Sequence, residues 1–389
     1  MIPFALPPAE TKLSLRALTQ GFLSHSSDFS KKLQALLGTK VCVLANSARA
    51  LLYLLFQDLR NRSASNGGEV LVPGYTCYSV PAALVKAGLQ VALYDIDPRS
   101  LQPDMADVKR KIKTNTLAIV VQQLLGVPAN IGELSKIARQ HGICCIEDSA
   151  QLLGPFQNIA GKEMAADFTV FSFGRGKPLP LGNGGALIAK KPDDLTRLAR
   201  DLKARPGKQG ISFLPFAVQI LAMPHFYWIV EKLPLGLGRT VYDPSFDVTD
   251  MPQLYQRFGA ATLDELVLLN LHRSDIAEIY HSYLSDKKDS RLTGNMPACV
   301  RYPLLVQNQG AAQRLARYGV RQFYPLALCD LLPLRHRLAG NAEMTPGARE
   351  IANRLITLPT HSAVNEKTAS QLVREVEQIF QQKTVIDFG

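Results

Sequence analysis

Short, continuous apolar runs alternate with helical patterns between residues 40 and 190. The apolar runs include VCVLA, EVLVP, VALYD, LAIVV, ICCIED and DFTVFSF, and the segment NIGELSKIARQHG has helical spacing of its apolar positions. Runs without a polar face are typical of parallel strands that are buried on both sides of a sheet. The pattern therefore predicts an α/β fold, in which a mainly parallel sheet lies between two layers of helices.

Polar and aromatic residues stand where these strands end. They are Asn46, the segment 75–78, Asp148 and Ser172. In open α/β sheets, ligands bind beyond the carboxyl ends of the strands. We therefore expect these residues to share one edge of the sheet. A helix that starts after Asn46 and Ser47, both favoured N-cap types, would add free N–H groups for an anion at that edge.

The pattern changes after Lys190. A basic amphipathic helix is predicted in LTRLARDLKARPGKQG, and no Asp, Glu, Lys or Arg occurs from Gln209 to Val230. Pro215 and Pro224 interrupt this apolar stretch, so two short helices are predicted rather than a membrane span. The insert 209–237 either packs against protein, which we favour, or docks on an anionic membrane surface through its basic flanks.

Three units follow from these patterns. Residues 1–30 are predicted to form an arm with one amphipathic helix, and residues 31–245 a large α/β domain that contains the insert. Residues 246–389 are predicted to form a smaller α+β domain. This last prediction rests on the helical stretch MPQLYQRFGAATLDELVLLNLHRSDIAEIYHSYL, the apolar runs RYPLLV and VRQFYP, and the closing amphipathic helix ASQLVREVEQIFQQ.

Composition and charge limit the function classes. The chain has 389 residues, of which 47% are apolar and 20% charged, the balance of a globular protein. Its net charge of +11 favours anionic partners, although the scattered basic residues form no nucleic-acid module, so no nucleic-acid partner is predicted. The N-terminus lacks the pattern of a secretory signal. The six cysteines form no CxxC pair, so we expect no metal site and a reducing, cytoplasmic location.

One lysine stands in a loop of unusual composition between two apolar runs. The loop of Lys177 contains Pro178, Pro180 and the glycines at positions 174, 176, 182, 184 and 185. Glycine allows backbone to come close to a ligand, and proline fixes the shape of the loop. Such a lysine is either a surface charge or a nucleophile.

The other strand-end residues favour the second reading. Pyridoxal phosphate requires a lysine for a Schiff base, an acid beside its ring nitrogen, an anion site for its phosphate and an aromatic neighbour. Lys177, Asp148, the helix start after Asn46 and the tyrosines of segment 75–78 match these requirements. Each residue alone has an ordinary structural role, but their combination predicts a site for this cofactor.

Several segments, in order, resemble the DegT/DnrJ/EryC1/StrS family of sugar aminotransferases, which have the type I fold of pyridoxal phosphate enzymes. The similar segments are EVLVPGYTCYSVPAALVKAGLQVALYDIDP, IEDSAQLLG, FSFGRGKPLPLGNGGAL, MPQLYQRFGAATLDEL and NRLITLPTH. The resemblance implies that Lys177 forms the Schiff base and moves the proton. Asp148 would pair with the ring nitrogen, and Gln151 would bond the ring hydroxyl oxygen if a helical turn follows Asp148.

The resemblance also implies that Ser172 and the helix start at Ala48 and Arg49 hold the phosphate. The family usually has Gly-Thr in place of Ala48-Arg49, and we expect Arg49 to supply a cationic phosphate contact. The ring-stacking aromatic of the family falls on Cys77, so either the neighbouring Tyr78 replaces it or the stacking on the ring is weak.

Further departures lie on the substrate side. Gly174 replaces a histidine, Val248 and Asp250 replace the Asn-x-Arg that a neighbouring subunit provides, and Cys329 falls near another usual histidine. By resemblance, a homodimer would transfer an amino group from a donor, glutamate in this family, to a keto group of a nucleotide-linked sugar. Other pyridoxal phosphate chemistry, a membrane-associated acceptor and a non-catalytic binding role stay open as alternatives.

Overall fold

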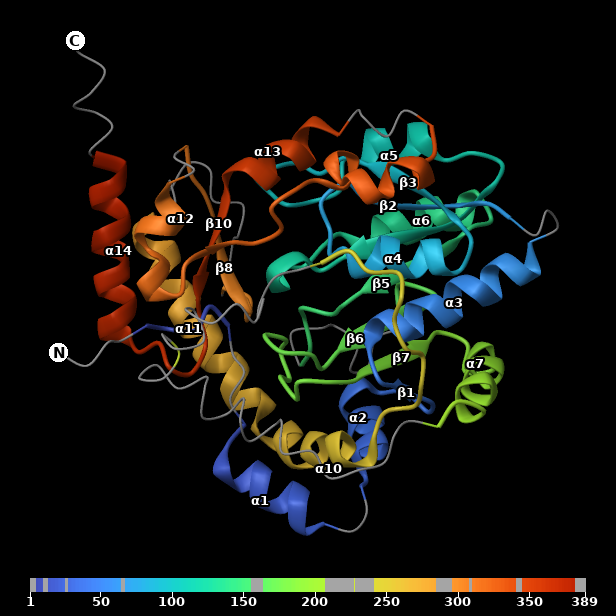
Figure 1. Ribbon diagram of the computed structural model, residues 1–389, viewed down its shortest axis with the longest axis horizontal. Helices are drawn as coiled ribbons and strands as arrows, with labels where there is room; N and C mark the ends of the chain where they lie inside the picture. The colour runs from blue at the N-terminus through green and yellow to red at the C-terminus, as the bar shows by residue number, and fades with distance from the viewer. Residues whose placement is uncertain are drawn as a thin grey trace.

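The computed structural model describes residues 5–9, 13–24, 27–63, 67–154, 164–206, 227, 241–284, 296–307, 310–340 and 345–381. Within these residues the largest element is a seven-stranded sheet with the order β1-β7-β6-β5-β4-β2-β3 (Figure 1). Its strands are β1 (Val43–Ala45), β2 (Glu69–Pro73), β3 (Gln90–Tyr94), β4 (Thr116–Gln122), β5 (Cys144–Asp148), β6 (Phe168–Ser172) and β7 (Gly185–Ala189).

The directions of the strands confirm the predicted edge. Neighbours from β3 to β6 pair in parallel, whereas β7 runs antiparallel to both β6 and β1. Strand β1 therefore points the same way as β5 and β6. Asn46, Asp148 and Ser172 consequently stand at one edge of the sheet, together with the segment after β2.

Helices cover both faces of this sheet, as the continuous apolar runs predict. One face packs against α3 (Ala48–Arg62), α4 (Ser79–Lys86) and α7 (Asp194–Lys203). The other face packs against α5 (Met105–Lys111), α6 (Ile131–Gln140), α2 (Phe29–Leu37) and α10 (Gln253–Thr262). Helix α1 (Leu15–Leu23) lies on α10. Buried aliphatic side chains on both faces supply most of the apolar burial that stabilises the fold.

A second, antiparallel sheet has the order β8-β10-β9, from β8 (Arg301–Leu305), β9 (Arg321–Gln322) and β10 (Leu355–Pro359). Two long helices, α11 (Leu266–Leu284) and α14 (Glu366–Gln381), pack together beside it (Figure 1). The remaining elements are η1 (Leu124–Gly126), η2 (Leu263–Glu265), α12 (Ala311–Arg314), η3 (Ala316–Tyr318), η4 (Leu328–Asp330), η5 (Leu332–Arg337) and α13 (Pro346–Arg354).

Hydrogen bonds tie the small sheet and its helices to the rest of the chain. The buried Asp95, just after β3, accepts hydrogen bonds from the N–H groups of Gly347 and Ala348 at the start of α13, at 2.9 and 2.8 Å. The segment 5–9 runs past the second sheet. There the Leu6 N–H donates to the Arg317 carbonyl at 2.9 Å, and a ring nitrogen of His361 lies 2.7 Å from the Pro7 carbonyl.

Three predictions about elements need correction or comment. The predicted strand VRQFYP pairs only at Arg321–Gln322, because the next residues turn towards α4. The predicted N-terminal arm, residues 1–30, was expected to contain one helix. Helix α2 begins at Phe29, so the first two residues of a second helix also lie within it. The insert 209–237 lies outside the described residues except for Tyr227. No helix in the described part of the chain is both long and apolar enough to span a membrane.

Gly185 allows α3 to begin directly against the sheet. This first residue of β7 pairs with Ala45 on one side and Ser172 on the other. A Cβ atom at position 185 would lie 2.4 Å from the backbone nitrogen of Ala48, the first residue of α3. Because glycine has only a hydrogen in place of a Cβ atom, the start of α3 can lie close to the ends of β1 and β6.

Replacing Gly185 tests this close approach. We expect Gly185→Ala to lower the free energy of unfolding by about 1–3 kcal/mol, because backbone rather than a flexible side chain must move. Gly132→Ala is the matched control, since a Cβ at Gly132 in α6 meets nothing within 4 Å. Urea unfolding of both variants measures the effect. Equal stability of the two variants would contradict the proposed role of Gly185.

Candidate functional site

The loop that carries Lys177 is held closed at its base. The Phe173 N–H donates to the Gly184 carbonyl at 2.9 Å, and residues 174 and 182 form a further bridge. The Gly184 N–H in turn donates to the Asn46 carbonyl at 3.0 Å. Gly184 has a φ of +104°, which side chains rarely allow, so a glycine is required there. The lysine loop and the turn from β1 to α3 therefore form one hydrogen-bonded unit.

Helix α11 fixes the same loop from the opposite side. The buried Arg273 donates to the carbonyl of Pro178, the residue after Lys177, at 2.9 Å and to Asn270 Oδ1 at 3.0 Å. Asn270 donates to the Leu153 carbonyl at 2.7 Å. One pair of side chains thus holds the lysine loop and the segment after β5 in a fixed relation.

Lys177 and Asp148 lie close enough for their charges to interact. Asp148 is the last residue of β5, is only 3% exposed, and accepts a hydrogen bond from the Ala150 N–H at 3.0 Å. Burial raises the pKa of Asp148, and the ammonium group of Lys177 and the Ala150 N–H partly oppose that rise. The site therefore contains a buried acid whose ionised form is stabilised by nearby positive charge.

Gln151 reaches the site through a turn and not through a helix. The chain after Asp148 makes a non-helical turn, in which the Leu152 N–H donates to the Ser149 carbonyl at 3.2 Å. The buried Gln151 side chain accepts a hydrogen bond from the Leu125 N–H and donates to the Tyr324 hydroxyl at 3.0 Å. Leu125 has a φ of +60°, an uncommon backbone state for a branched side chain.

Tyr324 belongs to an aromatic cluster that the sequence does not reveal. Its ring centroid lies 5.3 Å from that of Tyr75 and 5.9 Å from that of Tyr78. Its N–H donates to the Tyr75 hydroxyl at 2.9 Å. Burial raises the pKa of the Tyr324 phenol, and neighbouring groups, Asp148 among them, raise it further. Tyr324 therefore connects the small sheet to the acid at the end of β5.

The two residues predicted beside the cofactor ring have different surroundings. Tyr78 has its hydroxyl anchored to the backbone of Leu326, donating to the carbonyl at 2.9 Å and accepting from the N–H at 3.0 Å. Cys77 is half-buried, and its thiol lies 3.4 Å from Ser79 Oγ. Tyr78 thus packs on Tyr324 within the cluster, and Cys77 lies beside Tyr324 as well.

The start of α3 and Ser172 form a polar corner beside the lysine loop. Ser47 caps α3 by accepting a hydrogen bond from the Ala50 N–H at 3.1 Å, while the N–H groups of Ala48 and Arg49 belong to the first helical turn. Ser172 Oγ accepts a hydrogen bond from the Gly174 N–H at 3.4 Å. A Cβ at Gly174 would lie 3.6 Å from Ser172 Oγ and 3.9 Å from Lys177 Cγ, so these three residues are neighbours.

The Arg49 side chain is directed to a different set of partners from the one expected. Its guanidinium lies 4.4 Å from the ring centroid of Phe246, and Nη1 donates to the Asp243 carbonyl at 3.1 Å. The segment around Thr249, a few residues after Phe246, contacts the turn from β1 to α3. There the Asn46 N–H donates to the Thr249 carbonyl at 2.9 Å. The predicted cationic contact of Arg49 with a phosphate stays a prediction.

The remaining substrate-side positions are placed as follows. Val248 is 8% exposed, and Asp250 forms a bridge with Ala45 in β1. Cys329 lies in η4, is 9% exposed, and its sulfur accepts a hydrogen bond from Thr345 Oγ1 at 3.3 Å. The segment 248–250 therefore contacts its own chain, and Cys329 is covered.

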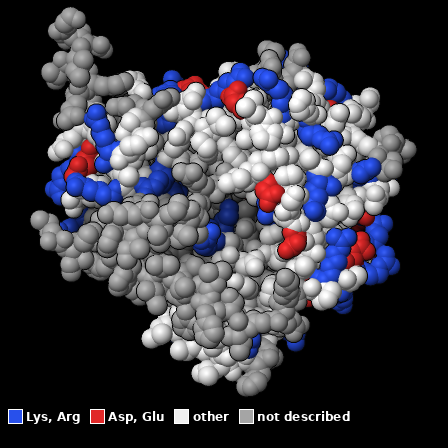
Figure 2. Space-filling view, viewed as in Figure 1, with Lys and Arg blue, Asp and Glu red and all other residues white. Residues whose placement is uncertain are grey.

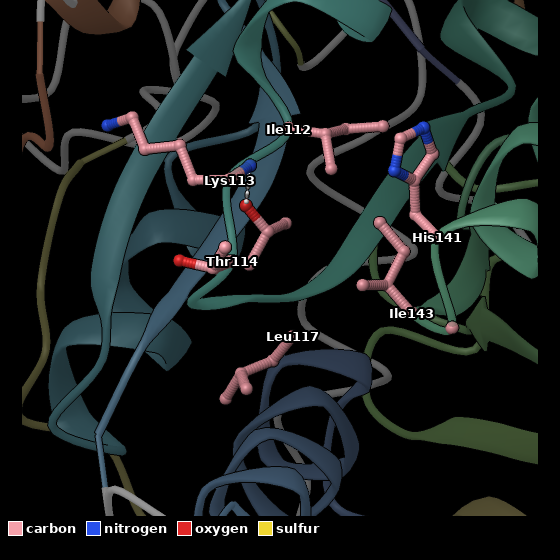
Figure 3. Close-up of a pocket in the computed structure, with 8 residues that line it drawn as sticks. Ile112, Lys113, Thr114, Leu117, His141 and Ile143 are labelled. Atoms are coloured by element: carbon pink, nitrogen blue, oxygen red, sulfur yellow. Dashed lines mark hydrogen bonds between the residues drawn. The ribbon is translucent and has the colours of Figure 1, made fainter.

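Figure 2 shows a hollow near the centre of the face in view with Lys or Arg atoms inside it, and the same place in Figure 1 lies between β8 and β6. A separate surface pocket of about 580 Å³ lies at the amino ends of β4 and β5, on the other edge of the sheet (Figure 3). Its lining includes Ile112, Lys113, Thr116, His141 and Ile143 and none of the predicted site residues.

The residues present fit pyridoxal phosphate. Lys177 provides an amine, and Asp148 provides a buried carboxylate that a cationic ring nitrogen would stabilise. The corner formed by Ser172 and the start of α3 provides a hydroxyl and backbone N–H groups for a phosphate. No group of three or more metal-ligating side chains occurs among the described residues.

Comparison with known proteins gives a consistent result. A sequence profile described as the DegT/DnrJ/EryC1/StrS aminotransferase family matches residues 11–214. A dTDP-4-dehydro-2,3,6-trideoxy-D-glucose 4-aminotransferase from Saccharopolyspora spinosa is 25% identical over 345 residues, which cover 86% of this chain and 83% of that protein. GDP-perosamine synthase from Vibrio cholerae is 29% identical over 223 residues, covering 57% of this chain and 53% of that protein.

The fold also resembles solved structures. The aminotransferase PseC from Helicobacter pylori, which is involved in the biosynthesis of pseudoaminic acid, superposes with a TM-score of 0.76. The match covers 97% of this chain and 100% of that chain at 18% sequence identity. This likeness shows that the two chains share the fold with the large mostly parallel sheet and the small antiparallel one.

The raised pKa of Asp148 predicts a pH dependence of stability without cofactor. Burial raises the pKa of Asp148 in the folded state. Its ionised form therefore lowers the free energy of unfolding, and this cost is fully present above the folded pKa, where the carboxyl is ionised in both states. We expect Asp148→Asn to raise the free energy of unfolding at pH 7. The gain should shrink as pH falls through the folded pKa, since the acid then becomes neutral as well.

Chemical unfolding of cofactor-free protein between pH 4 and pH 8 measures this difference. Asn keeps an oxygen that can accept the Ala150 hydrogen bond, so the substitution changes mainly the charge. Asp264→Asn is the control, because this acid is 56% exposed and pairs with Lys32 at the surface. An Asp148→Asn variant that is less stable than wild type at pH 7 would show that the ionised acid stabilises the cofactor-free fold.

Proposed function

The chain belongs to the DegT/DnrJ/EryC1/StrS aminotransferase family, and we propose that it transfers an amino group to a keto group of a nucleotide-linked sugar. The donor that fits the proposal is an amino acid such as glutamate. Two relatives whose names specify sugar nucleotides support this acceptor class. The observation that carries the proposal is the convergence of Lys177, Asp148 and the start of α3 at one edge of the sheet.

Pyridoxal phosphate, when bound, supplies an electron sink for the carbon that carries the transferred nitrogen. In this proposal Lys177 holds the cofactor covalently between reactions. During the reaction the amine of Lys177 would act as the base that takes a proton from the donor carbon and returns one to the acceptor carbon. The hydrogen bonds at the base of its loop, and the Arg273 contact to the next carbonyl, keep its amine in place.

The acid and amide orient the ring. Asp148 keeps the ring nitrogen protonated, because a buried carboxylate favours a cation beside it. Gln151 can offer its second amide hydrogen, since its other hydrogen-bonding groups are engaged by Leu125 and Tyr324. Ser172 and the N–H groups at the start of α3 bind the phosphate, where the helix dipole favours negative charge.

Two alternatives are weaker on these observations. A non-catalytic role would not require a buried acid beside the lysine or a closed lysine loop, both of which cost stability or conformational freedom. The membrane-associated acceptor depends on the insert 209–237, which lies outside the described residues apart from Tyr227. We therefore retain the sugar aminotransferase as the proposed function.

We also propose that the protein acts as a homodimer. Helix α11 exposes Val267, Leu268 and Leu271, of which Leu268 is 70% exposed. Helix α1 exposes Leu15 and Leu23, each 76% exposed, and it packs on α10, which leads into α11 through η2. Exposed aliphatic side chains grouped on connected helices are typical of a surface that another protein covers. A second copy of the chain is the partner that the family resemblance implies.

The lysine provides the direct test of the proposed function. Purified protein given pyridoxal phosphate should show a visible absorption band that glutamate bleaches, and Lys177→Ala should abolish both the band and amino transfer to keto sugars. Lys191→Ala is the control, because this lysine is exposed beyond β7. A band that persists in Lys177→Ala, or a wild-type protein that never forms one, would refute the proposal.

A charge on the exposed face of α11 tests the dimer. We expect wild-type protein to sediment as a dimer at micromolar concentration and Leu268→Glu to shift it to monomer, since a buried unpaired carboxylate opposes association. Leu332→Glu, at a residue of η5 that is 71% exposed, should leave the dimer intact. A monomeric wild type in sedimentation velocity would contradict this part of the proposal.

A further inference from the structure

Arg301 is a buried cation with few partners. It is the first residue of β8 and is only 6% exposed. Its Nη2 donates to the carbonyls of Gly319 and Thr357, both at the long distance of 3.3 Å, while its Nε has no hydrogen-bond partner. Among the described residues, no carboxylate forms an ion pair with it. Buried arginines are normally paired with an acid, so this arrangement is unusual.

Burial and a neighbouring cation both disfavour the cationic form of Arg301. Burial, together with the nearby charge of Arg321, lowers the pKa of Arg301 to about 9, while Tyr227 and Tyr75 act in the opposite direction. Two cations therefore lie near each other on the small sheet. An anion bound there would relieve both the desolvation of Arg301 and the repulsion between the two arginines.

Arg301 lies on the face of the small sheet that is turned away from α11. The next residue of β8, Tyr302, packs on Tyr280 of α11 with ring centroids 5.6 Å apart. Successive side chains of a strand alternate between its two faces, so Arg301 belongs to the opposite face. There its guanidinium lies 6.0 Å from the ring centroid of Phe323.

The residues on this face of the small sheet are connected by contacts to the candidate active site. Phe323 precedes Tyr324, whose N–H donates to Tyr75 and whose hydroxyl accepts from Gln151. The same Tyr75 is among the groups that act on Arg301 electrostatically. Phe323 packs on Tyr324 with ring centroids 4.2 Å apart, so Arg301 is connected to the aromatic cluster of the candidate site through Phe323.

We propose that Arg301 is a substrate-binding residue that receives an oxyanion, either the carboxylate of the amino donor or a phosphate of the sugar nucleotide. The inference rests on the proposed function and deepens it by assigning one residue to substrate recognition. A guanidinium offers two parallel N–H groups that match the two oxygens of a carboxylate or phosphate. The Nε and Nη2 atoms of Arg301 form such a pair. Nε has no hydrogen-bond partner, and the two hydrogen bonds of Nη2 are long, so both atoms can donate to an oxyanion.

Calorimetric titration of the cofactor-loaded protein tests the proposal and separates the two sources. One arm titrates 2-oxoglutarate as the carboxylate probe, and the other titrates dTDP, GDP and UDP as phosphate probes. We expect Arg301→Gln to weaken binding in one arm by on the order of ten- to a hundred-fold, the usual effect of losing a charged hydrogen bond. Arg301→Lys should retain part of the affinity, because it keeps the charge but not the fork.

Arg317→Gln is the matched control, because this arginine of the same region is exposed and paired with Glu375 at 3.3 Å. It should leave both arms unchanged. Melting temperatures of all variants identify a purely structural role of Arg301, which would lower stability without changing the affinity for either probe class. If the glutamine variant does not fold, the lysine variant decides by the same comparison.

The inference is overturned if both arms give wild-type dissociation constants in the Arg301 variants, or if wild-type protein binds neither probe class. Steady-state kinetics supply a second readout, in which the KM of one substrate rises and kcat changes little. These outcomes are distinct from failure of the proposed function. That failure would be the absence of the visible absorption band and of amino transfer in wild-type protein, whatever the titrations show.

Discussion

A carboxylate buried at the end of a central strand is the constraint on which the candidate site depends. Asp148 loses most of its hydration at 3% exposure, so its charge requires compensation from groups held at fixed positions. The amine of Lys177 and one backbone N–H provide part of that compensation. The closed lysine loop and the Arg273–Asn270 pair keep these groups from moving away. Much of the architecture around β5 and β6 can be understood as support for one buried charge.

Local patterns in the sequence were sufficient to predict the strands of the large sheet and the edge of that sheet where the candidate site lies. Each strand of the large sheet is a short apolar run, and a polar residue marks the end of β1, β5 and β6. The glycines and prolines around Lys177 likewise indicate a shaped loop, and the structure closes that loop with backbone hydrogen bonds. These features depend on neighbours in sequence, which is why they could be predicted. The domain bounds and the roles of the individual site residues stay predictions.

Contacts between distant segments could not be predicted in the same way. Arg273 reaches a carbonyl 95 positions away and Tyr324 meets Gln151 across 173 positions, although both arginine and tyrosine lie in ordinary amphipathic patterns. The segment after Asp148 forms no helix, and Gln151 is held there by Leu125 and Tyr324 and not by local helix bonds. Strand β9 ends early for a similar reason, since Tyr324 and Leu326 bond to tyrosines near α4. In each case a long-range partner outweighs the local preference.

The segment 5–9 has a consequence for the order in which the chain acquires its structure during synthesis. His361 and Pro7 are in contact although they lie 354 positions apart, and Leu6 donates to the carbonyl of Arg317. The large sheet can assemble from residues that leave the ribosome early, but the segment 5–9 has no place to bind until β10 and the turn after it have been made. The buried Leu6 therefore stays in water for most of translation. Binding of this segment is a late step, and an unfinished chain exposes the apolar residues around Leu6, which a chaperone can bind.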